Sequence, residues 1–133
     1  RRVVARADKG LCVAGVDDYW VGKPNLSDAL RSTPETVPVI LLSHNPDVAE
    51  LETEESYRVD LQVSGHTHGG QICLPCGIPV TLDSDCPRRL GKGFWQVNGM
   101  QGYTSPGAGT SVLNVRLNCP PEVTLHTLTR GPA

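Results

Sequence analysis

The chain has 133 residues, a formal net charge of -2 and 38% hydrophobic residues, a length that suits one domain. Aromatic residues make up only 5% of it, so we expect valine, leucine, isoleucine and alanine to build the core. The near-neutral charge argues against a basic nucleic-acid surface. No apolar run approaches the roughly 20 residues of a membrane-spanning helix.

The sequence begins with Arg1, and Met100 is its single methionine. We therefore expect an excerpt of a longer protein, in which the lack of a leader says little. The five cysteines are an odd number without regular spacing. That pattern argues against a disulfide scaffold and favours reduced thiols in a cytoplasm-facing domain.

Two β-type runs open the chain, at residues 1–7 and 11–16. Asp and Gly among residues 8–10 supply turn conformations, so the two runs predict a hairpin. Asn25 can then cap a short helix, in which apolar side chains of residues 26–30 share one face.

The next element is the apolar run at residues 37–42, which follows Pro34 and predicts a buried strand. Asn45 and Pro46 suit the cap and the first position of a second helix. The acidic stretch at residues 50–55 is expected to continue that helix as a solvated face.

Alternation of Val and Leu with polar residues at 58–64 predicts another strand, which runs into a segment rich in Gly and His at 65–71. Residues 73–110 are rich in Gly, Pro and Cys and indicate loops with short strands. Further alternation at 113–117 and 123–128 predicts a hairpin at the tail.

Histidines give the strongest functional signal. His66 and His68 are two residues apart in an extended segment, so both side chains point to one side. Neutral imidazole is a common ligand of Zn, Mn and Fe. His44 alone would be interpreted as a partly buried histidine, but it too follows a strand, so three strand-end imidazoles are expected to converge on a metal site. His126 is expected to be an ordinary strand residue.

The segments LLSHNPD at 41–47 and SGHTHGGQ at 64–71 resemble the last two motifs of the calcineurin-like metallophosphoesterase superfamily. Residues 15–18, 105–110 and 118–124 are similar to a bacterial branch that includes membrane-associated and cell-envelope enzymes. The resemblance covers nearly the whole chain. It implies an α/β (α+β) fold: part of a four-layer α/β/β/α sandwich, with a mixed sheet and two short helices.

The resemblance also implies a dinuclear centre of Mn, Fe or Zn that hydrolyses phosphate monoesters or diesters. His44 and His66 would ligate one metal and His68 the other. The residues that it places along the substrate are Asn45, Gly69, Gly70 and Gln71. It assigns no role to Asp17, Asp18 or the loop at 105–110.

The earlier motifs of the family, Asp-x-His, Gly-Asp and Gly-Asn-His-Asp/Glu, do not occur in this sequence. Residues 1–133 therefore resemble the C-terminal half of one domain, and an N-terminal half is the expected partner. That half would supply the bridging carboxylate and the proton-donor histidine, so no catalytic residue is assigned here. We expect the 133 residues alone to bind metal weakly and to be inactive.

The alternative is a non-catalytic metal-binding or interaction module. Cys73 and Cys76 form a CxxC pair near Cys86, and three thiolates with a histidine could hold a structural zinc. A local disulfide or plain packing of the cysteines also fits the sequence. A thioredoxin-like role is disfavoured, because Pro75 and the residues after it do not begin a helix.

A small basic cluster at Arg88, Arg89 and Lys92 is either a solvated loop or a contact for a phosphate-bearing substrate or an anionic lipid headgroup. The resemblance to the bacterial branch, with the reduced cysteines, implies a bacterial cytoplasmic or membrane-associated location. No nucleic-acid partner is indicated.

Overall fold

The computed structural model describes residues 2–6, 9–31, 33–51 and 58–129. They form one mixed sheet in the order β1-β2-β3-β4-β6-β5. Its central strands β2, β3, β4 and β6 run parallel, and β1 and β5 pair antiparallel at the two edges. The strands are β1 (Arg2–Arg6), β2 (Lys9–Gly15), β3 (Val39–Leu42), β4 (Leu61–Ser64), β5 (Gly93–Val97) and β6 (Met100–Thr104).

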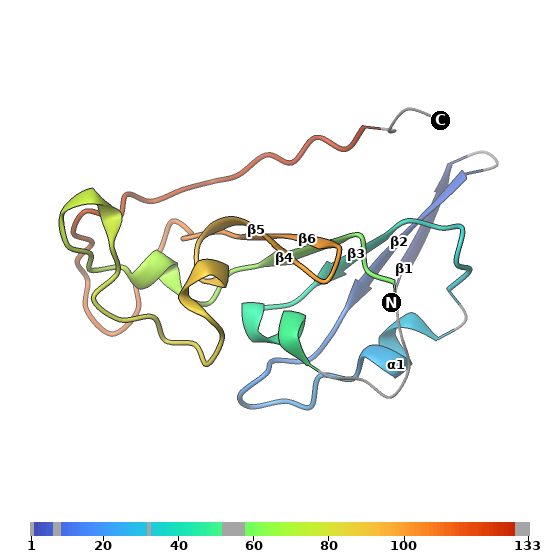
Figure 1. Ribbon diagram of the computed structural model, residues 1–133, viewed down its shortest axis with the longest axis horizontal. Coiled ribbons are helices and arrows are strands. Elements are labelled where there is room, and N and C mark those ends of the chain that lie inside the picture. Colours follow the sequence, from blue (N-terminus) through green and yellow to red (C-terminus); the bar gives the residue numbers. More distant parts are fainter. Residues whose placement is uncertain (1, 7–8, 32, 52–57, 130–133) are drawn as a thin grey trace.

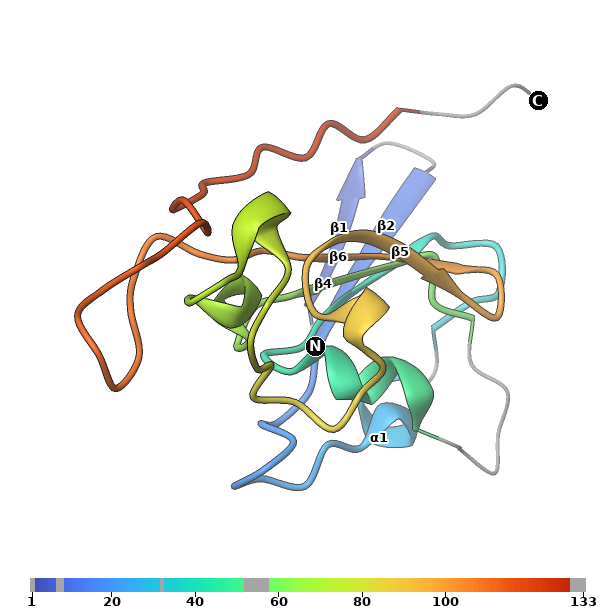
Figure 2. The ribbon, with the colours of Figure 1, turned by 60° about the vertical axis from the view of Figure 1, so that its left-hand side comes forward.

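Two short helices accompany the sheet, as predicted: α1 (Leu26–Leu30) and a 3-10 helix at Pro46–Glu50. Both lie on one side of it, and the chain after residue 119 passes on the other side (Figures 1 and 2). Shorter 3-10 turns occur at His68–Gly70, Pro75–Gly77 and Arg88–Leu90. The fold class is thus the expected α/β arrangement. The second sheet of a four-layer sandwich is not among the described residues.

The core lies between the sheet and α1, and it consists of small and branched side chains. Its buried members are Cys12, Ala14, Ala29, Leu30, Val39, Leu41 and Val48. Asn25 caps α1 as predicted, because its Oδ1 accepts a hydrogen bond from the Asp28 N–H at 2.9 Å. That contact satisfies one of the free N–H groups at the helix start.

The alternation in β4 buries the opposite face from the one expected. Gln62 and Ser64 are buried, and the apolar residues between and beside them are only half-buried. Gln62 Nε2 donates to Ser64 Oγ at 3.0 Å and to the Pro46 carbonyl at 3.3 Å. These bonds of Nε2 tie the 3-10 helix to the sheet, whereas Oε1 of the same amide is buried without a hydrogen-bond partner.

The helix after Asn45 is shorter than predicted. The 3-10 helix ends at Glu50, and Leu51 is already extended; residues 52–57, which carry most of the predicted acidic face, lie outside the described residues. Asn45 does not cap this helix with its side chain. Its Oδ1 instead accepts a hydrogen bond from the Tyr19 N–H at 3.1 Å.

The hairpin of β5 and β6 lies in the region where only loops with short strands were predicted. Its turn is Asn98-Gly99, both with positive φ (49° and 85°), a sequence and conformation typical of tight hairpins. Gly102 leaves room for the Trp95 ring, since a Cβ there would lie 2.1 Å from that ring. Trp95 Nε1 donates to Thr104 Oγ1 at 2.9 Å.

The predicted hairpin at the tail is wrong. Residues 113–117 contribute a single bridge, between Ile72 and Leu117, and residues 119–129 form no strand. His126 is therefore not a strand residue. The alternating side chains find no sheet in the described structure to cover them: Val123 is 91% exposed and Leu125 is 90% exposed. Alternation predicts an extended chain, which this segment has, but a strand also needs a neighbour.

Candidate metal site

Two loops that carry the predicted ligands leave the same edge of the sheet. β3 and β4 are parallel neighbours, with Leu42 paired to Val63, so their carboxyl ends lie together, where ligands collect in α/β sheets. The Gly65 N–H donates to the His44 carbonyl at 3.0 Å and joins the two loops directly.

The structure brings His44 and His66 into contact. Nε2 of His44 lies 3.2 Å from Nδ1 of His66, and the ring centroids are 5.0 Å apart at an interplanar angle of 76°. Two imidazole nitrogens that share one tetrahedral zinc at 2.0–2.1 Å would lie about 3.3 Å apart. The observed spacing is also that of a hydrogen bond between the two rings, and it is close to the spacing of two ligands of one cation.

Buried side-chain atoms without a hydrogen-bond partner occur on two of the histidines. They are Nε2 of His66, which is not the nitrogen that contacts His44, and Nδ1 of His68; Asn45 Nδ2 and Gln62 Oε1 are buried without a partner as well. A buried polar atom left without a partner costs about 1–3 kcal/mol, so such atoms need an explanation, and a bound cation is one.

His68 does not join the other two in one cluster. Within the described part of the chain, no group of three or more His, Cys, Asp or Glu side chains is arranged to hold a single metal ion. The structure thus joins two of the three predicted ligands. The dinuclear centre with three histidine ligands stays a prediction.

The histidine loop has an unusual backbone. His66, His68 and Gln71 have φ values of 67°, 51° and 51°, in the left-handed region that side chains other than glycine rarely adopt. Each such residue costs about 1 kcal/mol or more. Clusters of this kind occur where a site must present its side chains in one geometry.

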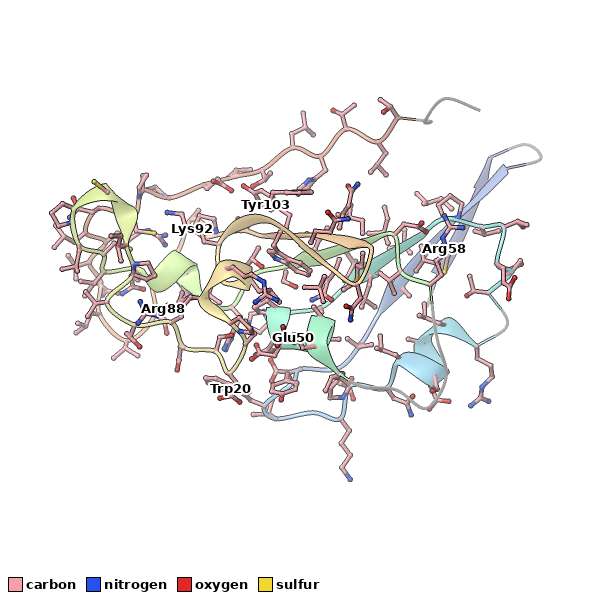
Figure 3. The ribbon with its side chains drawn as sticks, in the orientation of Figure 1. Trp20, Glu50, Arg58, Arg88, Lys92 and Tyr103 are labelled. Carbon is pink, nitrogen blue, oxygen red and sulfur yellow. The ribbon has the colours of Figure 1, made fainter. Side chains whose placement is uncertain are left out.

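Trp20 and Asp18 lie beside the histidine pair, on the loop after β2, and the sequence interpretation gave neither a role. The Trp20 ring stands edge-on to His66, with centroids 4.5 Å apart, and Figure 3 labels it. Asp18 accepts backbone hydrogen bonds from Val21 (3.0 Å) and Trp20 (2.8 Å). These bonds lower the pKa of Asp18, and the nearby His44 and His66 lower it further. Neither position could be predicted from the sequence, because it depends on the parallel pairing of β2 with β3, which brings the loop after β2 to the same edge.

The expected lining glycines are required by packing. Gly69 and Gly70 have positive φ values of 61° and 85°. A Cβ on Gly70 would lie 2.3 Å from Pro79 Cβ, and one on Gly69 would lie 2.9 Å from Pro106 Cβ. Both glycines let the loop turn tightly beneath the histidines.

Asn45 and Gln71 hold loops in place. Asn45 is fully buried, on the loop that carries His44. Gln71 Nε2 donates to the carbonyls of Ser111 (3.0 Å) and Leu113 (2.9 Å), and its Oε1 accepts from the Ser111 N–H at 2.6 Å. Contact of either side chain with a substrate stays a prediction.

The cysteines do not gather around a zinc. Cys73 is buried, with Sγ 3.4 Å from the Gly69 carbonyl, and its burial raises the pKa of this thiol. Cys76 is exposed, and Cys86 lies elsewhere, beside Ser84. All five are free thiols. The structural-zinc alternative receives no support from this arrangement.

The basic cluster is engaged within the molecule. Arg88 donates to the Pro79 carbonyl at 3.1 Å, and Arg89 pairs with Glu50 at 3.3 Å. Lys92 Nζ lies 3.7 Å from Cys119 Sγ. Figure 3 labels Arg88 and Lys92 toward the left of the molecule and Glu50 nearer its middle.

Comparison with known proteins identifies the family. The chain is 36% identical over 116 residues to the metallophosphoesterase YkuE of Bacillus subtilis, an alignment that covers 87% of this chain and 40% of that protein. It is 35% identical over 130 residues to phosphodiesterase YaeI of Escherichia coli, covering 95% and 44%. Over this shared region the chain belongs to the calcineurin-like metallophosphoesterase superfamily.

The chain spans less than half the length of these relatives. A cattle relative, 31% identical over 133 residues, is named a transmembrane protein with a metallophosphoesterase domain; the alignment covers 94% of this chain and 29% of that protein. Among the residues that the structure describes, none belongs to a helix with the length and apolarity to cross a bilayer. No family model and no solved structure matches the chain.

Proposed function

We propose that this chain contributes part of a divalent-metal centre that hydrolyses phosphate monoesters or diesters. The observation that carries the proposal is the contact between the His44 and His66 imidazoles at 3.2 Å, beside ring nitrogens buried without partners. The names of relatives support phosphoester hydrolysis as the general chemistry.

The chain's own residues hold and orient the ligands in this proposal. His44 and His66 bind one cation between the loops after β3 and β4, and His68 binds a second. The edge of the Trp20 ring covers one side of His66 and limits how far that imidazole can swing. The cations, of Mn, Fe or Zn, neutralise charge on the phosphoryl oxygens when bound.

Three neutral imidazoles leave the cations poorly neutralised. Asp18 is a carboxylate whose charge interacts with both His44 and His66, but it does not form a three-ligand group with them among the described residues. We propose that further carboxylate ligands come from outside these 133 residues, as the motifs missing from the sequence imply. The proposal therefore includes a phosphate-ester substrate and a partner segment. For the location we propose either the membrane or the cytoplasm.

Turnover of chromogenic substrates tests the function. The full-length protein, supplied with Mn²⁺, should hydrolyse bis(p-nitrophenyl) phosphate or p-nitrophenyl phosphate. His66→Ala should lower kcat/KM by more than ~100-fold, above what loss of a ligand's hydrogen-bond partner costs. His126→Ala is the matched control, because that ring lies against Tyr103, and it should stay within about twofold of the wild type.

Equal activity of the wild type and His66→Ala would refute the proposal. Manganese binding without turnover of either substrate by the full-length protein would favour the non-catalytic metal-binding module instead. The 133 residues alone should bind manganese weakly and show no turnover above the His66→Ala background.

A further inference from the structure

We propose that Arg116 is a positioning residue, whose guanidinium fixes the loop that carries His68 for metal binding. The inference rests on the proposed function and adds a residue to which that function assigns no role. It predicts that loss of Arg116 affects the cation held by His68 more than the cation shared by His44 and His66.

The guanidinium of Arg116 joins the distant histidine loop to two segments near Arg116 in the sequence. Nη2 donates to the His68 carbonyl at 3.0 Å and to the Pro106 carbonyl at 3.1 Å. Nη1 donates to the Gly109 carbonyl at 2.5 Å. Nε donates to the Cys119 carbonyl at 2.7 Å. One side chain thus holds the histidine loop, the loop at 105–110 and the turn at residue 119 together.

These contacts need the planar fork of an arginine. The guanidinium carries five N–H donors in a fixed plane, whereas a lysine offers three donors on one flexible point. The oxygens that accept from Arg116 are backbone carbonyls, and the ion pairs found among the described residues do not include it. Its role is therefore to fix geometry and not to neutralise a carboxylate.

His68 is the residue whose geometry most needs support. Its φ of 51° lies in the strained left-handed region, and its buried Nδ1 lacks a partner. Strained residues persist only where their surroundings over-determine them. The His68 carbonyl is held from two further sides, by the Gln71 N–H at 3.0 Å and by Cys119 Sγ at 3.4 Å, and Arg116 also reaches that sulfur at 3.4 Å.

Among the described residues, the hydrogen bonds of Arg116 do not reach the loop of His44. That loop is joined to its neighbour by the Gly65 hydrogen bond and by Asn45. Changes at residue 116 should therefore weaken the binding of the cation at His68 and leave the binding of the other cation unchanged. Loss of a residue needed only for general stability would weaken both.

The experiment compares R116K, R116Q, R116A and the control R89K in the full-length protein. Arg89 is a suitable control because it is exposed and its ion pair with Glu50 lies at the surface. Manganese per chain is counted by inductively coupled plasma mass spectrometry, its binding is titrated by calorimetry, and thermal unfolding is followed by circular dichroism.

We expect R116K and R116Q to weaken one of two manganese sites by about 10-fold or more, the effect typical of losing a group that orients a ligand. The other site and the R89K protein should stay within about twofold of wild type. Guanidinium ion, added below denaturing concentrations to an R116A protein, should restore part of the lost affinity.

Three outcomes contradict the inference. R116K with both sites intact would show that Arg116 does not position His68. Equal weakening of both sites together with a lowered Tm would show a general structural role, as would R116A that guanidinium does not rescue. Equal manganese binding by the wild type and by His66→Ala would instead refute the proposed function itself.

Discussion

Asp47 illustrates how single buried residues shape the surroundings of the histidine pair. It is 4% exposed, and it lies three residues after His44, in the 3-10 helix at Pro46–Glu50. Its Oδ1 accepts from the backbone N–H groups of Asp85 (2.7 Å) and Cys86 (2.9 Å), and Ser84 Oγ donates to its carboxylate at 3.1 Å. A buried carboxylate thus anchors the loop at 84–86 against the loop that carries His44.

Replacing that carboxylate should be costly. Asp47→Ala should lower the free energy of unfolding by about 2 kcal/mol or more, because hydrogen bonds to charged groups contribute roughly 1.5–3 kcal/mol. Urea denaturation measures the effect. Asp83→Ala, on an exposed residue of the same segment, should stay within about 0.5 kcal/mol. Equal stabilities of the two variants would contradict the anchoring role.

At the scale of elements, the hairpin of β5 and β6 depends on a glycine opposite a tryptophan. Gly102→Ala would place a methyl 2.1 Å from the Trp95 ring, so it should destabilise the protein by about 3 kcal/mol, the upper end for overpacking. Gly15→Ala is the matched control in a strand, since its Cβ would meet only the Leu42 carbonyl at 3.8 Å. Equal melting temperatures of the two variants in thermal unfolding would contradict this packing.

The tail segment is attached by hydrogen bonds that depend on pH. Tyr103 OH donates to Glu122 Oε1 at 2.5 Å, and Thr124 Oγ1 donates to the same oxygen at 2.6 Å. These bonds lower the pKa of Glu122 below its ordinary 4.5, and the bond to Glu122 raises the pKa of Tyr103 above its ordinary 10.0. The stabilisation from these hydrogen bonds is therefore fully present between pH 4.5 and pH 10.0.

We expect the tail to detach in two ranges. Its stabilisation is lost as the pH falls through the lowered pKa of Glu122, and again as the pH rises through the raised pKa of Tyr103. The NMR shift of the Thr124 methyl should report both steps, while a core methyl of Leu41 reports the fold as a whole. Tyr103→Phe should abolish the step at high pH. A Thr124 signal that follows Leu41 throughout would contradict the linkage.

Local sequence signals predicted the elements that are specified locally. Asn25 marked the start of α1, and the run ending at Leu42 marked β3, because caps and buried parallel strands have short-range signatures. The tail failed because Val123 and Leu125 alternate without a neighbouring strand. Alternation records which side chains share a face, but pairing depends on parts of the molecule far away in sequence.

At the scale of the whole molecule, the parallel core of the sheet explains why distant motifs meet. The loops after β2, β3 and β4 leave one edge, and they bring Asp18, His44 and His66 together. Sequence analysis foresaw the histidine pair because each residue directly follows a strand. It could not foresee Trp20, whose contact with His66 depends on the path of a loop, nor Arg116, whose partners lie up to 48 residues away.

The most direct test of the account is to locate the metal. Crystals of the full-length protein grown with Zn²⁺ should give an anomalous difference peak at the zinc edge within about 2.0–2.1 Å of a ring nitrogen of both His44 and His66. Zinc bound only at other places, or zinc absent while these two imidazoles remain in contact, would contradict the central claim that the pair is a metal-binding unit.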